Sequence, residues 1–390
     1  MHTNTERENN CKAVVVGGTS GIGLAAALEL AARGYAVTVI GRHDPEKPEL
    51  AFVQSDLRYF DENLFADLSA DQAVNVLLLT AGFGRVADFE SLHPGEIQAL
   101  FQVNTLSALQ IIRQFYGRLK GQARFYCGIL GSIAGLVSSP MFSVYAASKA
   151  ALCRFTESVN IELEAAGTAN RILNVCPGSI PGTGFNGGET DLAGLRPLGR
   201  EIVDRLFTGE TLYIPDYDKV YRGVLERYHA DSQAYGLESY QYKKASGRAQ
   251  NDRPVCVGYL SGTFDLFHIG HLNLFRRARA QCDYLIVGVH NSGSWKGKET
   301  FIPFEERMQI VGACQYVDRV VPACLEDSEA WEVHGFDKLF VGSDYQGTER
   351  FSHYEVFFAD KGVEIVYFPY TQGTSSTQLR AAIKAKNNDP

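Results

Sequence analysis

Two segments of the chain share one pattern, in which an apolar run leads into a glycine-containing turn, a helical stretch and a second apolar run. The first segment covers residues 13–42 and the second covers residues 254–290. This order of strand, helix and strand is typical of a βαβ unit. Further apolar runs alternate with amphipathic stretches in both halves, so each half is expected to form a parallel sheet covered by helices on both faces. These runs are residues 74–82, 124–132 and 170–178, then 318–323, 338–344 and 363–369.

The pattern therefore predicts an α/β protein with two doubly wound parallel-sheet domains. A length of 390 residues suits two or three domains of ordinary size. Residues 227–254 are polar, tyrosine-rich and almost free of aliphatic side chains, which is typical of a connection between domains. We expect a flexible N-terminus at residues 1–10, a first domain at 11–232, a linker at 233–253 and a second domain at 254–390.

Composition narrows the classes of partner. The net charge is −8, so a broad basic surface for nucleic acid is not expected, although a local basic pocket is compatible with it. No apolar run approaches the length of a membrane span, and the first ten residues lack the apolar core of a signal peptide. The eight cysteines are scattered without a C-x-x-C pair, which favours reduced thiols, no zinc cage and a cytoplasmic location.

The first half carries the elements of a dinucleotide site. Gly17, Gly21 and Gly23 follow a strand and open a helix, where glycine lets the backbone approach a pyrophosphate. A glycine-rich turn without a ligand is the alternative. Arg42 ends the next strand and suits the 2′-phosphate of NADPH, unless it is an ordinary surface arginine. Asp56, at the end of the third strand, either accepts from an adenine amino group or caps a turn.

A second group of residues in this half indicates proton chemistry. Tyr145 and Lys149 are four residues apart, which places both side chains on one face of a helix. A nearby ammonium is expected to lower the pKa of the tyrosine and make the phenol a usable proton donor. Ser132 ends a strand, where its hydroxyl can hold a carbonyl oxygen. A Tyr/Lys pair alone is usually a surface or packing feature, but its combination with the glycine turn, Ser132 and Asn104 argues against that interpretation.

With these motifs in order, the first half resembles the short-chain dehydrogenase/reductase family over about residues 11–230. The resemblance implies that Tyr145 is the general acid and that Lys149 binds the nicotinamide ribose. It also implies that Ser132 orients the substrate oxygen and that Asn104 supports a proton relay through water. A homo-oligomer is expected as well. The residues that the resemblance assigns to an NADPH cofactor are Gly17, Ser20, Gly21, Ile22, Gly23, Arg42, Asp56, Pro177 and Gly178.

Three features depart from the family pattern or leave it open. Val16 stands where a threonine usually precedes the first glycine, and residues 79–82 read Leu-Thr-Ala-Gly instead of Asn-Asn-Ala-Gly. These changes concern cofactor packing rather than proton transfer. The segment after Gly178 is glycine-rich and is followed by arginines that either face a phosphorylated substrate from a mobile lid or lie on an ordinary exposed helix. The arginines are Arg196, Arg200 and Arg205.

The second half contains a pair of histidines at the start of a predicted helix. His268 and His271 are three residues apart, and Gly270 between them allows a ligand to approach closely. Neither a third ligand nor an H-E-x-x-H pattern accompanies them, which argues against a metal site. Two donors at a helix N-terminus suit a triphosphate whose bridging oxygen gains charge as it leaves. Capping or core histidines are the alternative, weakened by the preceding Gly262-Thr263-Phe264-Asp265.

This half resembles the H-x-G-H cytidylyltransferases, especially those acting on glycerol 3-phosphate, over about residues 255–385. The resemblance implies that Lys296 and Lys298 supply cations to the phosphates and that Arg307 contacts the nucleotide. Tyr370 replaces an arginine of the glycerol-3-phosphate enzymes, which favours a longer polyol. The implied catalytic residues are His268, His271 and Lys298. The implied nucleotide-binding residues are Gly262, Thr263, Phe264, Asp265, Lys296, Arg307, Asp344, Thr374, Ser375 and Ser376.

Together the two resemblances predict a bifunctional enzyme. It would reduce a ketose phosphate with NADPH and then transfer CMP from CTP, with Mg²⁺ held by phosphate oxygens, to the resulting polyol phosphate. Products of the CDP-ribitol, CDP-mannitol or CDP-glucitol type would feed a bacterial surface polysaccharide. One alternative is a CDP-glycerol-type transferase joined to a reductase for a different metabolite. Another is a transferase joined to a cofactor-bound scaffold without catalytic activity.

Overall fold

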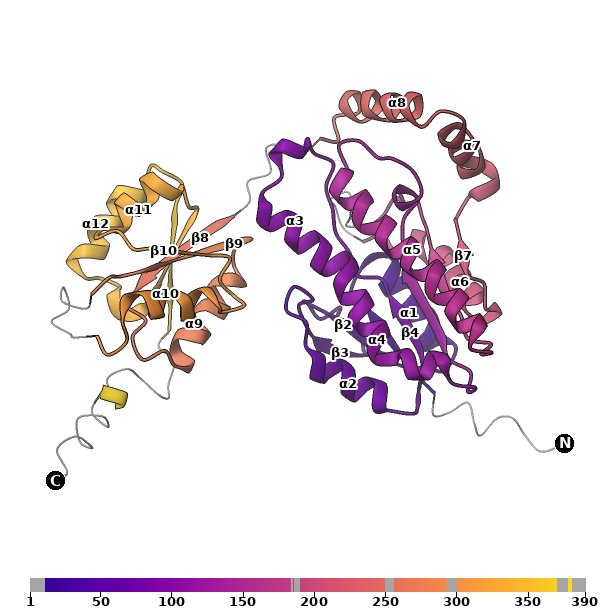
Figure 1. Cartoon of the computed structure of the whole chain (residues 1–390), viewed down its shortest axis with the longest axis horizontal. Coiled ribbons are helices and arrows are strands. Elements are labelled where there is room, and N and C mark those ends of the chain that lie inside the picture. Colours follow the sequence, from indigo (N-terminus) through magenta and orange to yellow (C-terminus); the bar gives the residue numbers. More distant parts are fainter. Residues whose placement is uncertain are drawn as a thin grey trace. The chain divides into compact units, whose positions relative to one another are not determined.

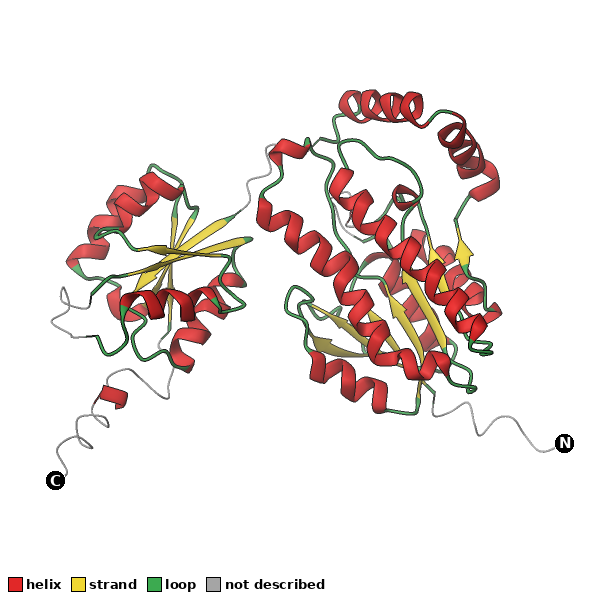
Figure 2. Ribbon diagram, in the orientation of Figure 1, coloured by secondary structure: helices red, strands yellow, loops and turns green. Residues whose placement is uncertain are grey.

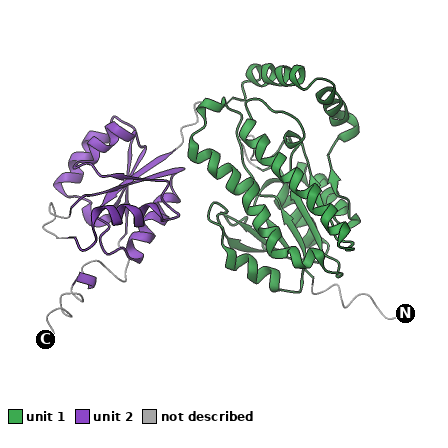
Figure 3. Cartoon of the chain, in the orientation of Figure 1, with its two compact units in different colours: residues 1–252 green, residues 253–390 purple. Residues whose placement is uncertain are grey.

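The chain folds into two compact units, residues 1–252 and residues 253–390 (Figure 3). The computed structural model describes residues 11–183, 185, 190–249, 256–292, 300–369 and 378–380. Within these ranges no helix is both long and apolar enough to cross a membrane. All eight cysteines lie in the described ranges, and none forms a disulfide.

The first unit is built on a seven-stranded parallel sheet with the order β3-β2-β1-β4-β5-β6-β7. Its first and second strands pair in register from Lys12 with Ala36 to Val16 with Ile40. The order reverses direction between β1 and β4, so their carboxyl ends border a crevice that is the usual ligand site of such sheets. The strands are β1 (Lys12–Val16), β2 (Ala36–Gly41), β3 (Leu50–Gln54), β4 (Val74–Leu79), β5 (Tyr126–Leu130), β6 (Ile172–Val175) and β7 (Leu212–Tyr213).

Helices cover both faces of this sheet (Figures 1 and 2). One apolar cluster joins the sheet to α1 (Gly21–Ala32) and α6 (Leu192–Thr208). A second cluster joins the other face to α2 (Glu62–Ala70), α4 (Ser107–Lys120) and α5 (Ser143–Ala165). The strands are therefore buried on both sides, which explains why β1 and β4 read as unbroken apolar runs.

Several short elements shape the carboxyl edge of this sheet. α3 (Pro94–Phe101) continues through a π-helical turn, η3 (Gln102–Leu106), into α4. A single 3₁₀ turn, η4 (Ile133–Gly135), follows β5, and a second π-helical turn, η6 (Tyr217–Tyr221), precedes α7. Such π turns insert an extra residue and often occur at functional sites. A further 3₁₀ turn, η2 (Phe89–Ser91), lies in the loop after β4.

The expected linker differs from the structure. Residues 222–245 form two helices, α7 (Arg222–Ala230) and α8 (Ser232–Ala245), outside the two helical layers of the first unit (Figure 1). α8 begins at an N-cap, because the Asp231 carboxylate accepts the backbone N–H groups of Gln233 and Ala234. It belongs to the first unit, since its lysine Lys243 hydrogen-bonds the loop before α5. The low aliphatic content reflects an exposed helical pair, not an unstructured connection.

The second unit has a five-stranded parallel sheet with the order β10-β9-β8-β11-β12. α9 and α10 pack on one face and α11 and α12 on the other. The switch between β8 and β11 places another crevice at the carboxyl end of β8. The elements are β8 (Val257–Gly262), α9 (Ile269–Arg279), β9 (Tyr284–Val289), α10 (Phe304–Gly312), β10 (Arg319–Pro322), α11 (Asp327–His334), β11 (Lys338–Gly342), the 3₁₀ turn η8 (Ser343–Tyr345), α12 (Glu349–Phe358) and β12 (Glu364–Phe368). The predicted fold class is confirmed in both units.

Candidate active sites

The glycine turn after β1 has the geometry of a dinucleotide-binding turn. Gly17 has φ +83°, and a Cβ there would overlap the backbone nitrogen of Ala81. A Cβ at Gly23 would overlap the Thr80 hydroxyl oxygen. Gly21, with φ +55°, is different, because a Cβ at this position would have no heavy atom within 4 Å. Two glycines thus permit close packing of the turn on β4, while the third leaves open space at the N-terminus of α1, where a pyrophosphate fits.

The N-terminal end of α1 also meets the segment that follows β6. Ser20 is the N-cap residue in an extended conformation, and its side chain makes no capping hydrogen bond. The backbone N–H of Gly21 donates to the Thr190 hydroxyl, at 3.3 Å. The residues assigned to the pyrophosphate, including Ile22 in the first turn of α1, therefore lie together at one helix N-terminus. This donor set fits an anionic group, because backbone N–H groups and the helix dipole both favour negative charge.

The two departures from the family pattern meet in space. The Thr80 hydroxyl donates to the Val16 carbonyl oxygen at 2.9 Å, and the Thr80 backbone N–H donates to the same oxygen at 2.7 Å. The same hydroxyl fills the space that a side chain at Gly23 would need. Thr80 therefore supplies, from β4, a hydroxyl that ties the glycine turn to the neighbouring strand. The sequence did not indicate this link, because the two positions are 64 residues apart.

The end of β2 carries the residue expected to select the cofactor. Arg42 is exposed, and it directly follows Gly41, which lies against the Thr19 side chain: a Cβ at Gly41 would be 2.7 Å from the Thr19 hydroxyl oxygen. Burial alone would raise the pKa of Asp56, but hydrogen bonds from Arg58 and the charges of Arg58 and Arg42 hold it below its ordinary value. Thr19, within the glycine turn, thus packs against Gly41, the residue before Arg42, a contact that spacing alone did not reveal.

Asp56 is engaged within the protein. The Arg58 guanidinium donates to both carboxylate oxygens, with a shortest distance of 2.6 Å. The Arg58 backbone N–H donates to the same carboxylate at 3.0 Å. This is the turn-capping alternative for Asp56. An adenine contact would need to share these oxygens, so the adenine role stays a prediction.

Tyr145 and Ser132 are brought together as predicted. Tyr145 is buried in the first turn of α5, and Ser132 caps the 3₁₀ turn after β5, where its hydroxyl accepts the Ala134 N–H at 3.2 Å. Burial raises the pKa of Tyr145 to about 12, although its hydrogen bond with Ser132 acts in the opposite direction. The Tyr145 ring stacks on Phe142, with 4.2 Å between centroids, and meets Phe185 edge-on at 5.2 Å. Two aromatic rings therefore enclose the phenol.

The expected lowering of the Tyr145 pKa by Lys149 is wrong, because the pKa of Tyr145 is raised. The Lys149 ammonium lies 5.8 Å from the centre of the Tyr145 ring and donates to the Leu130 carbonyl at 2.7 Å. Burial lowers the pKa of Lys149 to about 8. Removal from water is therefore the largest effect on both pKa values. Lys149 nevertheless lies within the group, one helical turn after Tyr145.

Asn104 holds the loop after β4 against α5. It lies in the π-helical turn η3, where its amide donates to the Phe83 carbonyl at 2.8 Å and to the Ser148 hydroxyl at 3.1 Å. Its side-chain oxygen accepts the Phe83 N–H at 2.9 Å. A Cβ at Gly82 would lie 3.1 Å from the Lys149 ammonium nitrogen. Asn104 is therefore placed beside Lys149, and its proton-relay role stays a prediction.

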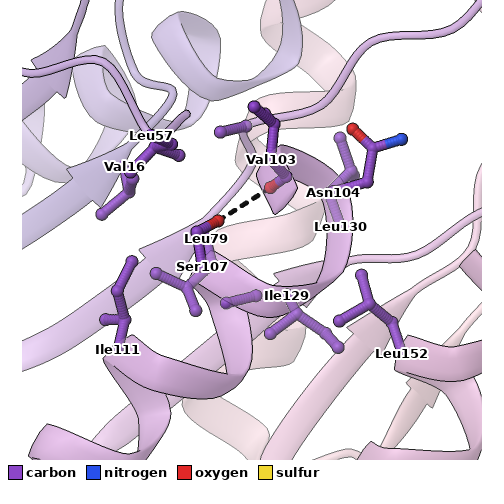
Figure 4. A pocket seen from close by; sticks show the side chains of 12 residues that line it. Val16, Leu57, Leu79, Val103, Asn104, Ser107, Ile111, Ile129, Leu130 and Leu152 are labelled. Carbon is purple, nitrogen blue, oxygen red and sulfur yellow. Dashed lines mark hydrogen bonds between the residues drawn. The ribbon is translucent and has the colours of Figure 1, made fainter. Parts of the chain in front are cut away.

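A small pocket lies directly behind Asn104 at the switch between β1 and β4 (Figure 4). In Figure 4 the Ser107 hydroxyl donates to the Val103 carbonyl, at 2.8 Å, and the other side chains of the wall are apolar except for Asn104. The pocket is lined by Val16, Leu57, Leu79, Ala81, Val103, Asn104, Ser107, Ala108, Ile111, Ile129, Leu130 and Leu152. Its wall reaches Leu57, the residue after Asp56, so it lies beside the predicted adenine end of the cofactor site.

The Pro177-Gly178 segment is fixed from two sides. The Pro177 carbonyl accepts the Ile133 N–H at 3.0 Å, which joins it to the turn that carries Ser132. A Cβ at Gly178 would overlap the Tyr221 hydroxyl oxygen. Glycine is therefore required at this position because the η6 side chain Tyr221 occupies the space. Local motifs did not indicate Tyr221, because it lies far from Gly178 along the chain.

The arginines after Gly178 do not face the Tyr145 site through a lid. They lie on α6, which packs on α1, across the sheet from α5. Arg205 pairs with Glu201 and Glu210, and its guanidinium lies 4.2 Å from the centre of the Tyr213 ring. Arg200 lies 3.8 Å from Glu29. Arg200 and Arg205 therefore lie on an ordinary exposed helix, as the second of the two expectations had it. Arg196 is exposed on the same helix.

In the second unit, the two histidines at the start of α9 face one another. Their rings stack with 4.0 Å between centroids. Nδ1 of His268 accepts the Gly270 N–H at 3.0 Å, and Nδ1 of His271 accepts the His268 N–H at 3.4 Å. A neutral imidazole whose Nδ1 accepts carries its proton on Nε2. Both histidines thus present an Nε2–H donor.

The surroundings of both histidines favour the neutral form. Burial lowers the pKa of His271 to about 3, assisted by the neighbouring His268, and burial also lowers the pKa of His268. Two uncharged N–H donors at a helix N-terminus can bind phosphate oxygens. Among the described residues, no group of three or more His, Cys, Asp or Glu side chains is arranged to hold a metal ion. This local chemistry fits an anion.

The loop between β8 and α9 is held in an unusual backbone conformation. Phe264 and Leu266 both have φ +50°, which is a costly conformation for residues with side chains. The Phe264 ring is buried against His271, at 5.4 Å, and a Cβ at Gly262 would lie 2.7 Å from this ring. Phe264 therefore supports His271 by packing and does not present its side chain to a nucleotide. The role of Phe264 in nucleotide binding stays a prediction, and in this arrangement its backbone would make the contact.

Asp265 also acts within the protein. Its buried carboxylate accepts the N–H groups of Phe301 and Ile302, and it forms an ion pair with Arg380 at 2.6 Å. These contacts join the loop after β8 to the residues just before α10 and to Arg380. Asp265 thus positions the surrounding loops, and its contact with a nucleotide stays a prediction. The last motif in the sequence ends at residue 377, so the sequence did not indicate Arg380 as a partner of Asp265.

Arg307 has a similar positioning role. Its side chain is completely buried, and its guanidinium donates to the carbonyl groups of Thr263, His290 and Asn291, while Nε donates to Ile302. One side chain therefore fastens the loops after β8 and β9 to the start of α10. Four of the five guanidinium N–H groups of Arg307 donate to carbonyl groups of the protein, and its contact with a nucleotide stays a prediction.

The remaining predicted residues of the second unit fall into two groups. Asp344 and Thr263 are described: Asp344 is exposed in η8, where a Cβ at Gly342 would overlap its carboxylate, and Thr263 contributes its carbonyl to Arg307. The predictions on Lys296, Lys298, Tyr370, Thr374, Ser375 and Ser376 lie outside the described residues.

Fold and sites together define a dinucleotide-binding unit with a buried Tyr/Ser/Lys group, followed by a nucleotide-binding unit with paired histidines. Residues 12–191 match the short chain dehydrogenase family, and residues 259–382 match the cytidylyltransferase-like family. The chain therefore belongs to both families, one in each unit. It is a reductase-type domain fused to a cytidylyltransferase domain.

Curated relatives match the second unit. The glycerol-3-phosphate cytidylyltransferase of Bacillus subtilis is 33% identical over 126 residues, which are 31% of this chain and 92% of the relative. The Staphylococcus aureus enzyme of the same name is 33% identical over 130 residues, 32% of this chain and 93% of the relative. A solved short chain dehydrogenase from Burkholderia cenocepacia in complex with NADP is 23% identical, covers 60% of this chain and 98% of that chain, and has a TM-score of 0.49.

Proposed function

We propose that this enzyme reduces a ketose phosphate with NADPH to a polyol phosphate and then transfers CMP from CTP to give a CDP-polyol. One observation carries the proposal: a buried Tyr145/Ser132/Lys149 group and a pair of Nε2–H donors at His268 and His271 occur in one chain. The first group suits reduction of a carbonyl, and the second suits displacement at a phosphate. A molecule that carries both a carbonyl and a phosphate is the economical substrate for the two reactions in sequence.

In the first unit, the residues place a carbonyl and deliver a proton to it. NADPH, when bound along the glycine turn, supplies the hydride to the carbonyl carbon. The Ser132 hydroxyl holds the carbonyl oxygen, and the Tyr145 phenol gives that oxygen its proton as the C–H bond forms. Lys149, one helical turn away, stabilises the tyrosinate that remains when its ammonium is protonated. The Phe142 ring, stacked on Tyr145, excludes water from one side of the phenol.

The preference for NADPH rests on Arg42. Its guanidinium is exposed at the end of β2, beside the turn that would hold the pyrophosphate. A guanidinium pairs with a 2′-phosphate by charge and by its fork of N–H donors. No acidic residue stands at position 42 to accept from the ribose hydroxyls of NAD.

In the second unit, positioning and charge stabilisation support phosphoryl chemistry. A phosphate oxygen of the polyol phosphate attacks the α-phosphorus of CTP in line, and pyrophosphate leaves with the electron pair of the broken P–O bond. The Nε2–H groups of His268 and His271 donate to phosphate oxygens that gain charge in this step. Mg²⁺ would be held mainly by phosphate oxygens, as hard cations often are. Asp265 and Arg307 keep the surrounding loops in place.

The size of the substrate is inferred from the second unit. Tyr370 stands where the glycerol-3-phosphate enzymes have an arginine. Loss of that cation supports a polyol phosphate of five or six carbons, so the products would be of the CDP-ribitol, CDP-mannitol or CDP-glucitol type. Such a product is a donor for a surface polysaccharide. We therefore expect the enzyme to act in the cytoplasm, where CTP and NADPH are found, and to form a homo-oligomer.

One assay tests the proposed function. The full chain is incubated with NADPH, CTP, Mg²⁺ and a panel of ketose phosphates from three to six carbons, and the products are identified by mass. We expect a CDP-linked polyol from at least one five- or six-carbon substrate, with one NADPH oxidised for each CDP-polyol formed. Formation of CDP-linked product without oxidation of NADPH by any ketose phosphate would contradict the proposal.

A further inference from the structure

We propose that Lys243, on α8, binds the phosphate group of the carbonyl substrate in the first unit. The inference rests on the proposed function, because it assigns a binding residue to the ketose phosphate. Lys243 lies in the segment that the sequence pattern indicated as a linker, outside the part of the chain matched by the dehydrogenase family.

The position of α8 places this lysine beside the catalytic group. The Lys243 ammonium donates to the Ser139 hydroxyl at 2.6 Å and to the Pro140 carbonyl at 2.9 Å. It also lies 6.0 Å from the centre of the Phe142 ring, which stacks on Tyr145. These residues belong to the loop between Ser132 and Tyr145. The Lys243 ammonium is therefore held next to the Phe142 ring, which stacks on Tyr145. The carbonyl group of the substrate must lie beside Tyr145 to receive its proton.

A second contact shows that α8 lies over this loop. Gly236, two helical turns before Lys243, has the Ser138 hydroxyl 3.5 Å from the position that its Cβ would take. The loop after β4 also contacts the loop between Ser132 and Tyr145, since the Ala87 N–H donates to the Met141 carbonyl at 2.6 Å. Lys243 is thus fixed by the scaffold of the site and does not swing freely on the surface.

The charge of Lys243 is not compensated within the described part of the chain. Among the described residues, its ammonium contacts the Ser139 hydroxyl, the Pro140 carbonyl and the Phe142 ring, and none of these groups is a carboxylate. Burial lowers the pKa of Lys243 to about 8, and no acidic neighbour raises it. An ammonium has three N–H donors, of which two are used by Ser139 and Pro140. A partly buried cation with a donor left over is stabilised by an anion, and a phosphate dianion supplies one.

The neighbouring Lys244 shows the opposite arrangement. It is exposed, and its ammonium donates to the Tyr240 hydroxyl at 3.2 Å. The Tyr240 hydroxyl and the charges of Tyr240 and Asp88 raise the pKa of Lys244. Lys244 therefore carries the same charge on the same helix but already has partners. It provides a matched control for any general effect of net charge on α8.

The first test compares substrates with and without the phosphate. Steady-state reduction is measured for full-length wild type, Lys243→Met, Lys243→Arg and Lys244→Met with each ketose phosphate and its free ketose. We expect Lys243→Met to raise KM for the phosphorylated substrate about tenfold to a hundredfold, the range for a hydrogen bond to a charged group. Lys243→Arg should restore part of that loss. Reduction of the free ketose by Lys243→Met, and of both substrates by Lys244→Met, should stay within about twofold of wild type.

The second test does not depend on turnover. The full chain is treated with an amine-reactive reagent in the presence and absence of inorganic phosphate, and modification of each lysine is followed by peptide mass spectrometry. We expect phosphate to protect Lys243 and to leave Lys244 unprotected. Absence of protection at Lys243, or equal losses for phosphorylated and free ketose in Lys243→Met, would overturn the inference. If phosphate protects Lys243 but no ketose phosphate is reduced, the anion site stands and the proposed reaction fails.

Discussion

At Tyr145 and Lys149, removal from water has a larger effect on the pKa than the proximity of the two groups. The pKa of Tyr145 is raised to about 12 and that of Lys149 is lowered to about 8, both by burial. The raised pKa of Tyr145 keeps the phenol protonated, which is the form needed to deliver a proton. The sequence predicted the pair itself, because spacing on a helix is local, but not the direction of the shifts, because burial is set by the whole fold.

The histidine pair leads to a prediction about protonation. In the free protein, both imidazoles should carry their proton on Nε2, and His271 should stay neutral from about pH 8 down to about pH 5, because its pKa is lowered to about 3. Long-range ¹H–¹⁵N spectra of ¹⁵N-histidine-labelled protein report both the tautomer and the titration, and a His271→Asn variant assigns the signal. A titration midpoint near the ordinary histidine value of about 6.5, or a proton on Nδ1, would show that the hydrogen bonds are different from those described.

Arg42 leads to a prediction about cofactor selection. Replacing Arg42 with Asp removes the partner of the 2′-phosphate and adds a negative charge beside it, so binding of NADPH should weaken by about tenfold or more. Binding of NADH should change much less, since NADH lacks the 2′-phosphate. The dissociation constants are measured by fluorescence titration, with Arg58→Met as a control for general loss of charge near Asp56. An unchanged ratio of the two constants would remove Arg42 from the cofactor site.

Among the secondary-structure elements, α8 departs most from what the sequence pattern indicated. The strands and glycine turns were predictable because apolar runs and helix starts are local signals. α8 was not, because Gly236 and Lys243 gain their contacts only from a loop that lies much earlier in the chain. The same reason applies to Tyr221 against Gly178 and to Arg380 with Asp265. Long-range partners of short motifs are therefore the part of the sites that spacing does not supply.

The position of α8 leads to a prediction about truncation. A chain that ends at residue 252 keeps α8 and should retain reduction, whereas a chain that ends at residue 231 lacks it and should lose at least about tenfold in kcat/KM, the scale of a lost hydrogen bond to a charged group. The reason is that the substrate phosphate loses its contact with Lys243, and that the loop before α5 loses the cover of the whole helix α8, including Gly236 against Ser138. Circular dichroism and thermal unfolding show whether each fragment is folded. Equal activity of the two folded fragments would show that α8 has no part in the site.

At the scale of the whole molecule, the chain consists of two units, each with its own sheet, apolar clusters and site. Every residue that we assign to reduction lies in the first unit, and every residue assigned to nucleotidyl transfer lies in the second. The two reactions should therefore be separable by single substitutions. Their order follows from chemistry, because a ketose phosphate offers the carbonyl first and its reduced product keeps the phosphate that attacks CTP.

Reciprocal loss of the two reactions is the most direct test of this account. Tyr145→Phe and His268→Ala are each assayed for reduction, with NADPH and either ketose phosphate or CDP-ketose, and for transfer, with CTP and polyol phosphate. Products are identified by mass. Tyr145→Phe should lose reduction by about a hundredfold or more and still convert polyol phosphate to CDP-polyol. His268→Ala should lose transfer on a similar scale, oxidise NADPH with ketose phosphate and accumulate polyol phosphate. If His268→Ala oxidised NADPH only with a CDP-ketose, transfer would precede reduction and the proposed order would be wrong.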